Sequence, residues 1–213
     1  MQSVVEADID IDPYVVLQAD AMAVFTGISN VHSLLLSTRS LEVLLTCDPL
    51  PIFANLVELE IPYCPDHKEC SISTNKGLET LLTSSPELEK HSFYQEFLCS
   101  LPEEVPHCLL FRLKVIEVSG FMNYGNYIEK AKYILKNGGA LEKLTIRTTP
   151  NVSQAERLKI SQALSGCPRK AQQCCVLVLC HSYCGCEIDE DDAIALGKWN
   201  WDYHRMVYFH NKS

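Results

Sequence analysis

A short apolar pattern recurs along this sequence and restricts its fold more than any other feature. Apolar residues occupy the first, fourth and sixth places of a six-residue segment that begins at residues 31, 56, 113 and 141, and a degraded copy begins at residue 88. The successive spacings are 25, 32, 25 and 28 residues. The segments contain Val31, Leu34 and Leu36; Leu56, Leu59 and Ile61; Leu88, His91 and Phe93; Leu113, Ile116 and Val118; and Leu141, Leu144 and Ile146. A recurring period of this length indicates a repeat architecture.

Each period contains the elements of a strand and a returning segment. Apolar residues at the fourth and sixth places predict a strand with one buried face, and the first apolar residue closes the preceding turn. Helices are expected at 77–84, 127–136 and 153–164, and a final buried strand at 174–180. Ser153, with Glu156 three residues later, forms a capping-box sequence that marks a helix start. His91 stands at an apolar place, which indicates an irregular repeat or, alternatively, a polar pocket.

The spacing of most segments is that of a leucine-rich repeat. One such unit cannot bury its apolar face alone, whereas stacked neighbours share a continuous core. The expected fold class is therefore α/β: a short leucine-rich-repeat solenoid with a curved parallel sheet and helices on the outer face. The alternative is a doubly wound α/β domain, which would have variable spacing and a glycine-rich turn after an early strand.

The charge distribution bears on which partners the chain can bind. The net charge of -9 divides into 17 acids and 4 bases over residues 1–105, and 10 acids and 14 bases over residues 106–213. The acidic half repels phosphate and the bases of the second half are scattered, so nucleic acid is not an expected partner. No apolar run is long enough to span a membrane, and the start of the chain is acidic rather than basic. These features predict a cytoplasmic or nuclear protein, with its eleven cysteines reduced.

Catalytic and cofactor motifs do not stand out. The sequence contains neither a phosphate-binding loop with its lysine nor the elbow that presents a nucleophilic serine. We therefore expect a non-enzymatic protein with no catalytic residues and no cofactor.

Two groups of residues suggest metal binding. Cys180, His181, Cys184 and Cys186 could ligate zinc, but their spacing matches no paired zinc knuckle, and a loop with free thiols is the expected structure. Asp8, Asp10 and Asp12 alternate with isoleucines, which suggests either a calcium loop or an edge strand with one side in water. The glycine and closing glutamate of a calcium loop are absent, so we expect the strand and no metal site.

Several short motifs resemble one plant family. Residues 30–34, 41–44 and 49–56 resemble the leucine-rich-repeat region of plant F-box proteins. The sequences at 105–109, 113–117, 120–121, 133–137, 141–146 and 167–170 resemble, in order and spacing, the FBD domain that many of those proteins carry. The resemblance covers roughly residues 5–180. It implies a leucine-rich-repeat region at 1–104, an FBD domain that continues the solenoid at 105–180, and a divergent C-terminal tail at 181–213.

The resemblance implies the substrate-receptor part of a cullin-type ubiquitin ligase, in which the F-box docks on a Skp-type adaptor and the repeats hold a protein substrate. We recognise no F-box in this sequence, and residues 101–105 are interpreted as a connector between repeats. An indirect link to adaptor and cullin is therefore expected. The alternatives are a truncated receptor fragment without independent activity and, from the cysteine and histidine cluster, a zinc- or thiol-dependent protein.

The repeat also predicts a contact surface. In a solenoid, residues that flank the buried fourth and sixth places point to the concave face of the sheet. The predicted partner-binding residues are Ser33, Leu35, Ser37, Glu58, Glu60, Lys90, Ser92, Val115, Glu117, Ser119, Lys143, Thr145 and Arg147. Their charge changes from acidic to mixed along the face, which suits a polypeptide partner better than an anionic ligand.

Overall fold

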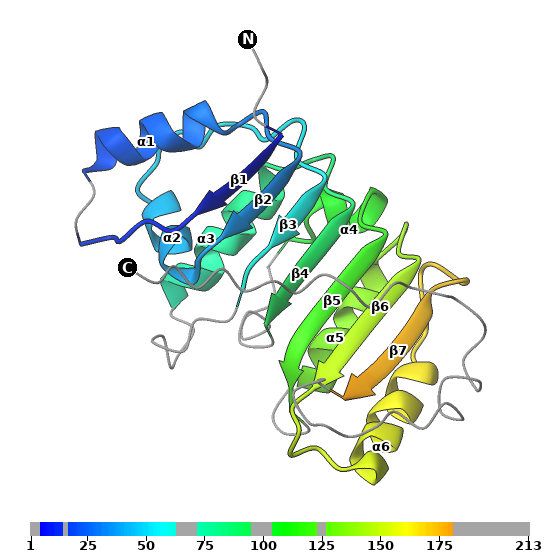
Figure 1. The fold of residues 1–213 in the computed structure, drawn as a ribbon. Helices are drawn as coiled ribbons and strands as arrows, with labels where there is room; N and C mark the ends of the chain where they lie inside the picture. The colour runs from blue at the N-terminus through cyan, green and yellow to red at the C-terminus, as the bar shows by residue number, and fades with distance from the viewer. Residues whose placement is uncertain (1–4, 15–16, 63–71, 95–103, 123–126, 181–213) are drawn as a thin grey trace. The chain divides into compact units, whose positions relative to one another are not determined.

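The computed structural model describes residues 5–14, 17–62, 72–94, 104–122 and 127–180. Within these residues, seven strands form one parallel sheet, and each of the six connections contains one helix (Figure 1). The strands are β1 (Glu6–Ile9), β2 (Ser33–Leu36), β3 (Glu58–Glu60), β4 (Lys90–Tyr94), β5 (Val115–Phe121), β6 (Lys143–Thr148) and β7 (Cys175–Cys180). The helices are α1 (Gln18–Gly27), α2 (Thr38–Leu44), α3 (Ile72–Thr83), α4 (His107–Phe111), α5 (Tyr127–Asn137) and α6 (Gln154–Ser165).

The repeated apolar places fall into rows across the sheet. The row of fourth places consists of Leu34, Leu59, His91, Ile116, Leu144 and Val176, each aligned with the next. The expected α/β class and the parallel pairing of the repeat strands are thus confirmed. The sheet begins one strand earlier than the repeat predicts, because Ala7 of β1 is aligned with Leu34.

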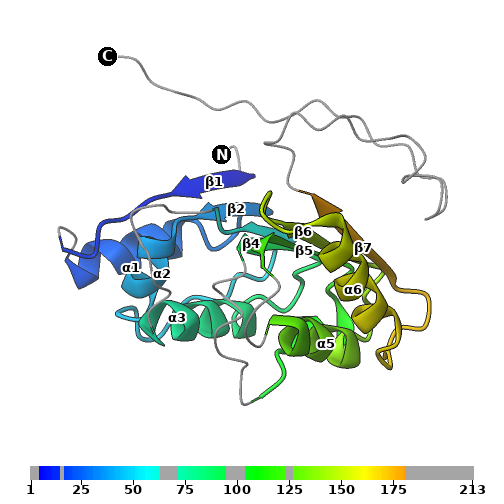
Figure 2. The same cartoon turned by 90° about the horizontal axis from the view of Figure 1, so that it is seen from below.

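The order of the strands decides against the doubly wound alternative. A doubly wound sheet reverses its strand order at one point and carries helices on both faces. In the described residues the order runs from β1 to β7 without reversal. Figure 2 shows the helices on one side of the sheet, so the other side has no helical layer among the described residues.

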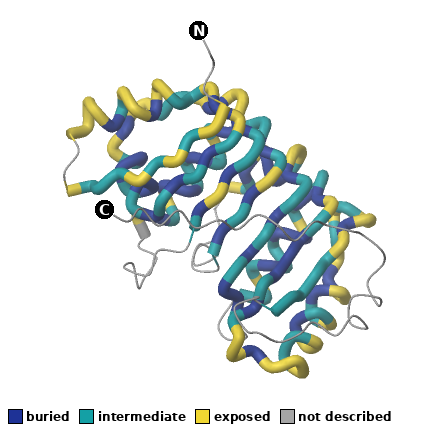
Figure 3. Tube along the Cα trace, viewed as in Figure 1, coloured by how far each residue is buried: buried dark blue, intermediate teal, exposed yellow. Residues whose placement is uncertain are grey.

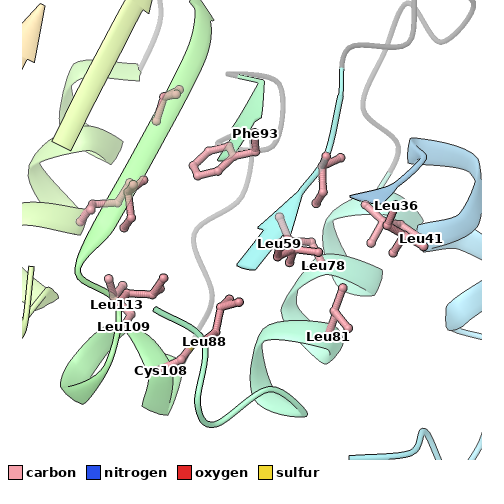
Figure 4. Close-up of a cluster of buried hydrophobic side chains, with 14 of the residues drawn as sticks. Leu36, Leu41, Leu59, Leu78, Leu81, Leu88, Phe93, Cys108, Leu109 and Leu113 are labelled. Carbon is pink, nitrogen blue, oxygen red and sulfur yellow. The ribbon is translucent and has the colours of Figure 1, made fainter. Parts of the chain in front are cut away.

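The core lies between the sheet and its helices. Burial alternates along the strands, as Figure 3 shows, because every second side chain points toward the helical layer. Figure 4 shows how side chains from different elements meet there: Leu59 of β3 and Leu78 and Leu81 of α3 lie in one cluster. The cluster continues to Cys108 and Leu109 of α4, so neighbouring units share one core.

The helices agree with expectation where a clear signal exists. The predicted helices at 127–136 and 153–164 are confirmed as α5 and α6, and Ser153 and Glu156 form the expected capping box. Helix α3 begins earlier than predicted, at Ile72. Helices α1, α2 and α4 were not expected. Neither α1 nor α4 has a side-chain cap at its start, and α2 and α4 have only 7 and 5 residues.

His91 occupies an apolar place of the core without a complete set of hydrogen bonds. Its side chain is 4 % exposed, and its ring stacks on Phe93 with 4.6 Å between centroids. Nδ1 lies 3.2 Å from the carbonyl oxygen of Leu59, whereas Nε2 has no partner in the described structure. Burial lowers the pKa of His91 from 6.5 to about 4, only partly offset by the Leu59 carbonyl. The histidine is therefore an irregular residue of an apolar row.

We predict that His91→Phe removes part of the acid sensitivity of the fold. A histidine with a pKa of about 4 when folded and 6.5 when unfolded gives full stability above pH 6.5. Stability is then lost as the pH falls, by about 3 kcal/mol near pH 4. Urea unfolding between pH 8 and pH 4.5 should show a smaller loss for His91→Phe than for the wild type. The exposed His32, changed to Phe, is the control and should keep the wild-type pH dependence. Equal pH dependence in all three proteins would contradict the prediction.

Candidate protein-interaction face

The sheet face opposite the helices, here called the open face, carries two complete rows of side chains. The first row consists of Glu6, Ser33, Glu58, Lys90, Val115, Lys143 and Cys175. The second row consists of Asp8, Leu35, Glu60, Ser92, Glu117, Thr145 and Leu177. Neighbouring positions in a row are about 4.8 Å apart, the spacing of paired strands. One extended ligand could therefore contact many strands at once.

The structure brings the predicted partner-binding residues together on this face, but they differ in solvent exposure and in their contacts within the protein. All except Thr145 are exposed or half-buried. Thr145 is aligned with Glu117 and Leu177 but is only 2 % exposed. Ser37 accepts a hydrogen bond from the Ser40 backbone N–H and caps α2. Thr145 and Ser37 therefore offer less contact than alternation along the strand suggests.

Four charged residues of the open face form pairs between adjacent strands. Lys90 of β4 forms an ion pair with Glu58 of β3. Arg147 of β6 donates to both carboxylate oxygens of Glu117 in β5, with Nη2 3.4 Å from Oε2. These pairs are a third to a half exposed, so they contribute little stability. Their main effect is to fix where each charge lies.

Glu60 has neither an ion-pair nor a hydrogen-bond partner in the described structure. Partial desolvation raises its pKa above 4.5, and repulsion from Glu117 and then from Asp8 raises it further. All three carboxylates belong to the second row. Arg147 neutralises Glu117, whereas no cation is paired with Glu60 or Asp8 in the part of the chain that the structure describes.

The acidic strand β1 extends the face beyond the residues expected to bind. Glu6 and Asp8 are exposed, whereas Ala7 and Ile9 are half-buried, so the expected edge strand with one side in water is present, but it ends at Ile9 and leaves Asp10, Ile11 and Asp12 outside it. Arg39 Nη2 lies 2.7 Å from Asp10 Oδ2 and its Nη1 4.0 Å from Asp12 Oδ2. The pKa of Asp10 is lowered by a hydrogen bond from Ser37 and by Arg39, although desolvation opposes the shift.

The end of β1 is fixed by one buried hydroxyl. The Ile11 N–H donates to Ser40 Oγ at 2.8 Å, and Ser40 Oγ lies 3.2 Å from the Ile9 carbonyl oxygen. The sequence signal for β1 was the alternation of aspartate and isoleucine. That alternation predicts a strand, but it does not show that the strand joins the repeat sheet.

The repeat pattern also did not predict a role for Tyr94, whose position depends on a glycine. Gly120 in β5 has a φ of 71°, and a Cβ atom placed there would lie 2.5 Å from Cε1 of the Tyr94 ring. Tyr94 and Ser119 are aligned, and the register shifts after Val118. An aromatic ring can lie over β5 at this point because residue 120 has no side chain.

At β7 the open face becomes apolar. Leu177 lies beside Thr145, and Leu179 lies beside Arg147. The expected terminal strand is confirmed, although its residues were not predicted to belong to the face. The open face thus changes from acidic at β1, through paired charges, to apolar at β7.

The described residues contain no group of three or more histidine, cysteine or acidic side chains that could hold a metal ion. Six cysteines in this part of the chain carry free thiols: Cys47, Cys108, Cys167, Cys174, Cys175 and Cys180. Apart from Cys180, the candidate zinc cluster lies outside the described residues, as does the tail at 181–213. The helices from α1 to α6 include none that is long and apolar enough to cross a membrane.

The fold and the open face define an α/β protein in which consecutive strand and helix units build one parallel sheet, exposed on one side. Residues 101–146 match the FBD family model. An FBD-associated F-box protein of Arabidopsis thaliana is 30 % identical over 72 % of this chain and 33 % of its own length. A putative F-box/FBD/LRR-repeat protein of the same plant is 28 % identical, over 84 % of this chain and 41 % of its own length. An F-box/LRR-repeat protein is 30 % identical over 76 % of this chain and 41 % of its length.

These findings confirm the predicted resemblance: the chain is related to the plant F-box/FBD/LRR-repeat proteins and contains the region that the FBD model describes. The chain spans about a third to two fifths of the length of the curated relatives it matches. The matched segment begins in the connection before α4 and ends within β6.

We predict that Gly120→Ala destabilises the protein by about 1 to 3 kcal/mol, because it combines a positive φ with a clash against the Tyr94 ring. Gly166→Ala is the matched control. Gly166 has a φ of -78°, and the atom nearest to an added Cβ is 3.7 Å away. The control should be neutral or slightly stabilising. Urea unfolding of both variants measures the difference, and equal stabilities would contradict the role assigned to Gly120.

Proposed function

We propose that this chain is a non-enzymatic protein-binding module that acts as the substrate-holding part of an F-box-type ubiquitin-ligase receptor. The observation that carries the proposal is the open face itself. Parallel sheets are ordinarily covered by helices on both faces, whereas the helices described in this protein lie on one face only. Its uncovered rows carry charged, polar and apolar side chains in register, which suits recognition of a polypeptide.

We further propose that the sheet is a short leucine-rich-repeat solenoid whose open face is the concave one. The support is the alignment of the repeated apolar places in rows and the uniform order of the strands. Solenoids of this kind use extended concave surfaces for binding. The names of the relatives, which include F-box, FBD and LRR-repeat, agree with this assignment.

The charge pattern favours one kind of partner. Glu60 has no cation beside it among the described residues, and repulsion from Glu117 and Asp8 contributes to its raised pKa. A polypeptide that places lysine or arginine over β1 to β3 would supply the missing charge. Skp-type adaptor and cullin belong to the proposal as indirect partners, and the cytoplasm or nucleus as its location.

We predict that the double variant Glu58→Lys/Glu60→Lys loses its protein partner, with recovery reduced at least tenfold, which corresponds to about 1.4 kcal/mol or more. The measurement is affinity purification of the tagged chain from its native tissue, with partners quantified by mass spectrometry. Skp-type adaptor and cullin are scored separately from other proteins. Recovery of a partner should depend on the open face.

The matched control is Glu129→Lys, an exposed charge reversal on α5 in the helical layer. It should leave partner recovery unchanged. If the same partner is recovered equally with both variants, the open face does not bind it and the proposed contact surface is wrong.

A further inference from the structure

Strand β7 has an outer edge without a strand partner in the part of the chain that the structure describes. The Cys175 N–H donates to the Glu142 carbonyl oxygen at 2.8 Å, and the Leu179 carbonyl oxygen accepts from Thr148 Oγ1 at 3.2 Å. These contacts show that Cys175 and Leu179 direct their backbone groups toward β6. Because backbone direction alternates along a strand, the N–H and carbonyl groups of Val176 and Val178 point to the outer edge.

Both faces of β7 are apolar and incompletely covered. Leu177 and Leu179 lie on the open face, whereas Val176 and Val178 pack against the core. All four side chains are half-buried. One strand further in, Leu144 and Ile146 are 0 % exposed. An uncharged strand that is apolar on both faces is typical of a strand with neighbours on each side.

The opposite edge of the sheet is different. Strand β1 carries the exposed carboxylates Glu6 and Asp8, and charges on an edge strand oppose pairing with another chain. Strand β7 contains no charge and no proline over Cys175–Cys180. The sheet thus has one edge that resists strand addition and one that favours it.

We propose that β7 pairs with β7 of a second copy of this chain, antiparallel and about a twofold axis perpendicular to the sheet. Opposite residues of an antiparallel pair lie on the same face, so Leu177 can meet the partner's Leu177 while Val176 meets the partner's Val178. The outward backbone groups of Val176 and Val178 then form the hydrogen bonds between the copies.

A second copy fits this edge better through its β7 than through its β1. Pairing β7 with β1 of another copy would place Glu6 and Asp8 in the same rows as Cys175 and Leu177, which desolvates carboxylates beside apolar side chains. Pairing of β7 with β1 would also continue from copy to copy without end, whereas a twofold contact is complete with two copies. The closed pair presents two open faces with their acidic ends outermost.

The test is sedimentation velocity of the full 213-residue chain over a wide concentration range, under reducing conditions. The wild type should be a dimer that dissociates on dilution. Val178→Pro removes a backbone donor that points outward and leaves the donors that face β6 in place, although it also replaces a side chain that packs against the core. We expect at least a tenfold increase in its dimer dissociation constant. Leu177→Lys, which places a charge at the centre of the contact, should have the same effect.

The matched control is Leu35→Lys, the same substitution in the same row but on β2, far from the outer edge of β7. It should leave the dissociation constant unchanged, and circular dichroism verifies that each variant is folded. A wild type that is monomeric at every concentration overturns the proposal. So does an open-ended polymer, or a dimer that neither β7 variant weakens.

Discussion

No single strand and helix of this chain can bury its own apolar residues, and the whole structure follows from that constraint. The fourth places of the repeats align across neighbouring strands, and the side chains that face the helices are largely inaccessible to water. Full burial of a leucine or isoleucine contributes roughly 1.5 to 3 kcal/mol, so a row becomes stable only when several units are stacked. Because all the helices in the described part of the chain lie on one side, the other side of the sheet has no helical layer there.

The packed core keeps the strands of the open face in place, whereas the electrostatic character of this face comes from its charged side chains. Lys90 with Glu58, and Arg147 with Glu117, form half-exposed pairs that add little to stability. Glu60 lacks such a partner, and its neighbours in the row increase the cost of its ionisation. A ligand that brings a cation to this point gains an interaction that the protein itself does not supply. If the open face binds a polypeptide as proposed, the distribution of pairs affects the preference for a partner more than it affects folding.

The sequence pattern predicted the parts of the fold that depend on periodicity. Strands β2 to β6 were expected from alternation, and α5 and α6 from helical spacing and a capping box. Helices α1, α2 and α4 lack such signals because short helices are stabilised by packing rather than by their own sequence. The burial of Thr145 was not predictable either. Alternation gives the face on which a side chain lies, but its exposure depends on the neighbours that folding brings beside it.

The two ends of the sheet are not equivalent, and this gives the open face a direction. A polypeptide that crosses the strands meets carboxylates at β1, an uncompensated Glu60 at β3, paired charges from β3 to β6, and leucines at β7. Only a polypeptide that is basic at one end and apolar at the other matches this order. In the reverse orientation, its apolar groups would lie over the carboxylates. In the proposed function, the gradient would therefore select the orientation of the polypeptide as well as its composition. If β7 pairs with β7 of a second copy, the leucines of both copies lie at the centre of one continuous open surface. Two such polypeptides would then lie with their basic ends at the two acidic ends of this surface and their apolar ends at its centre.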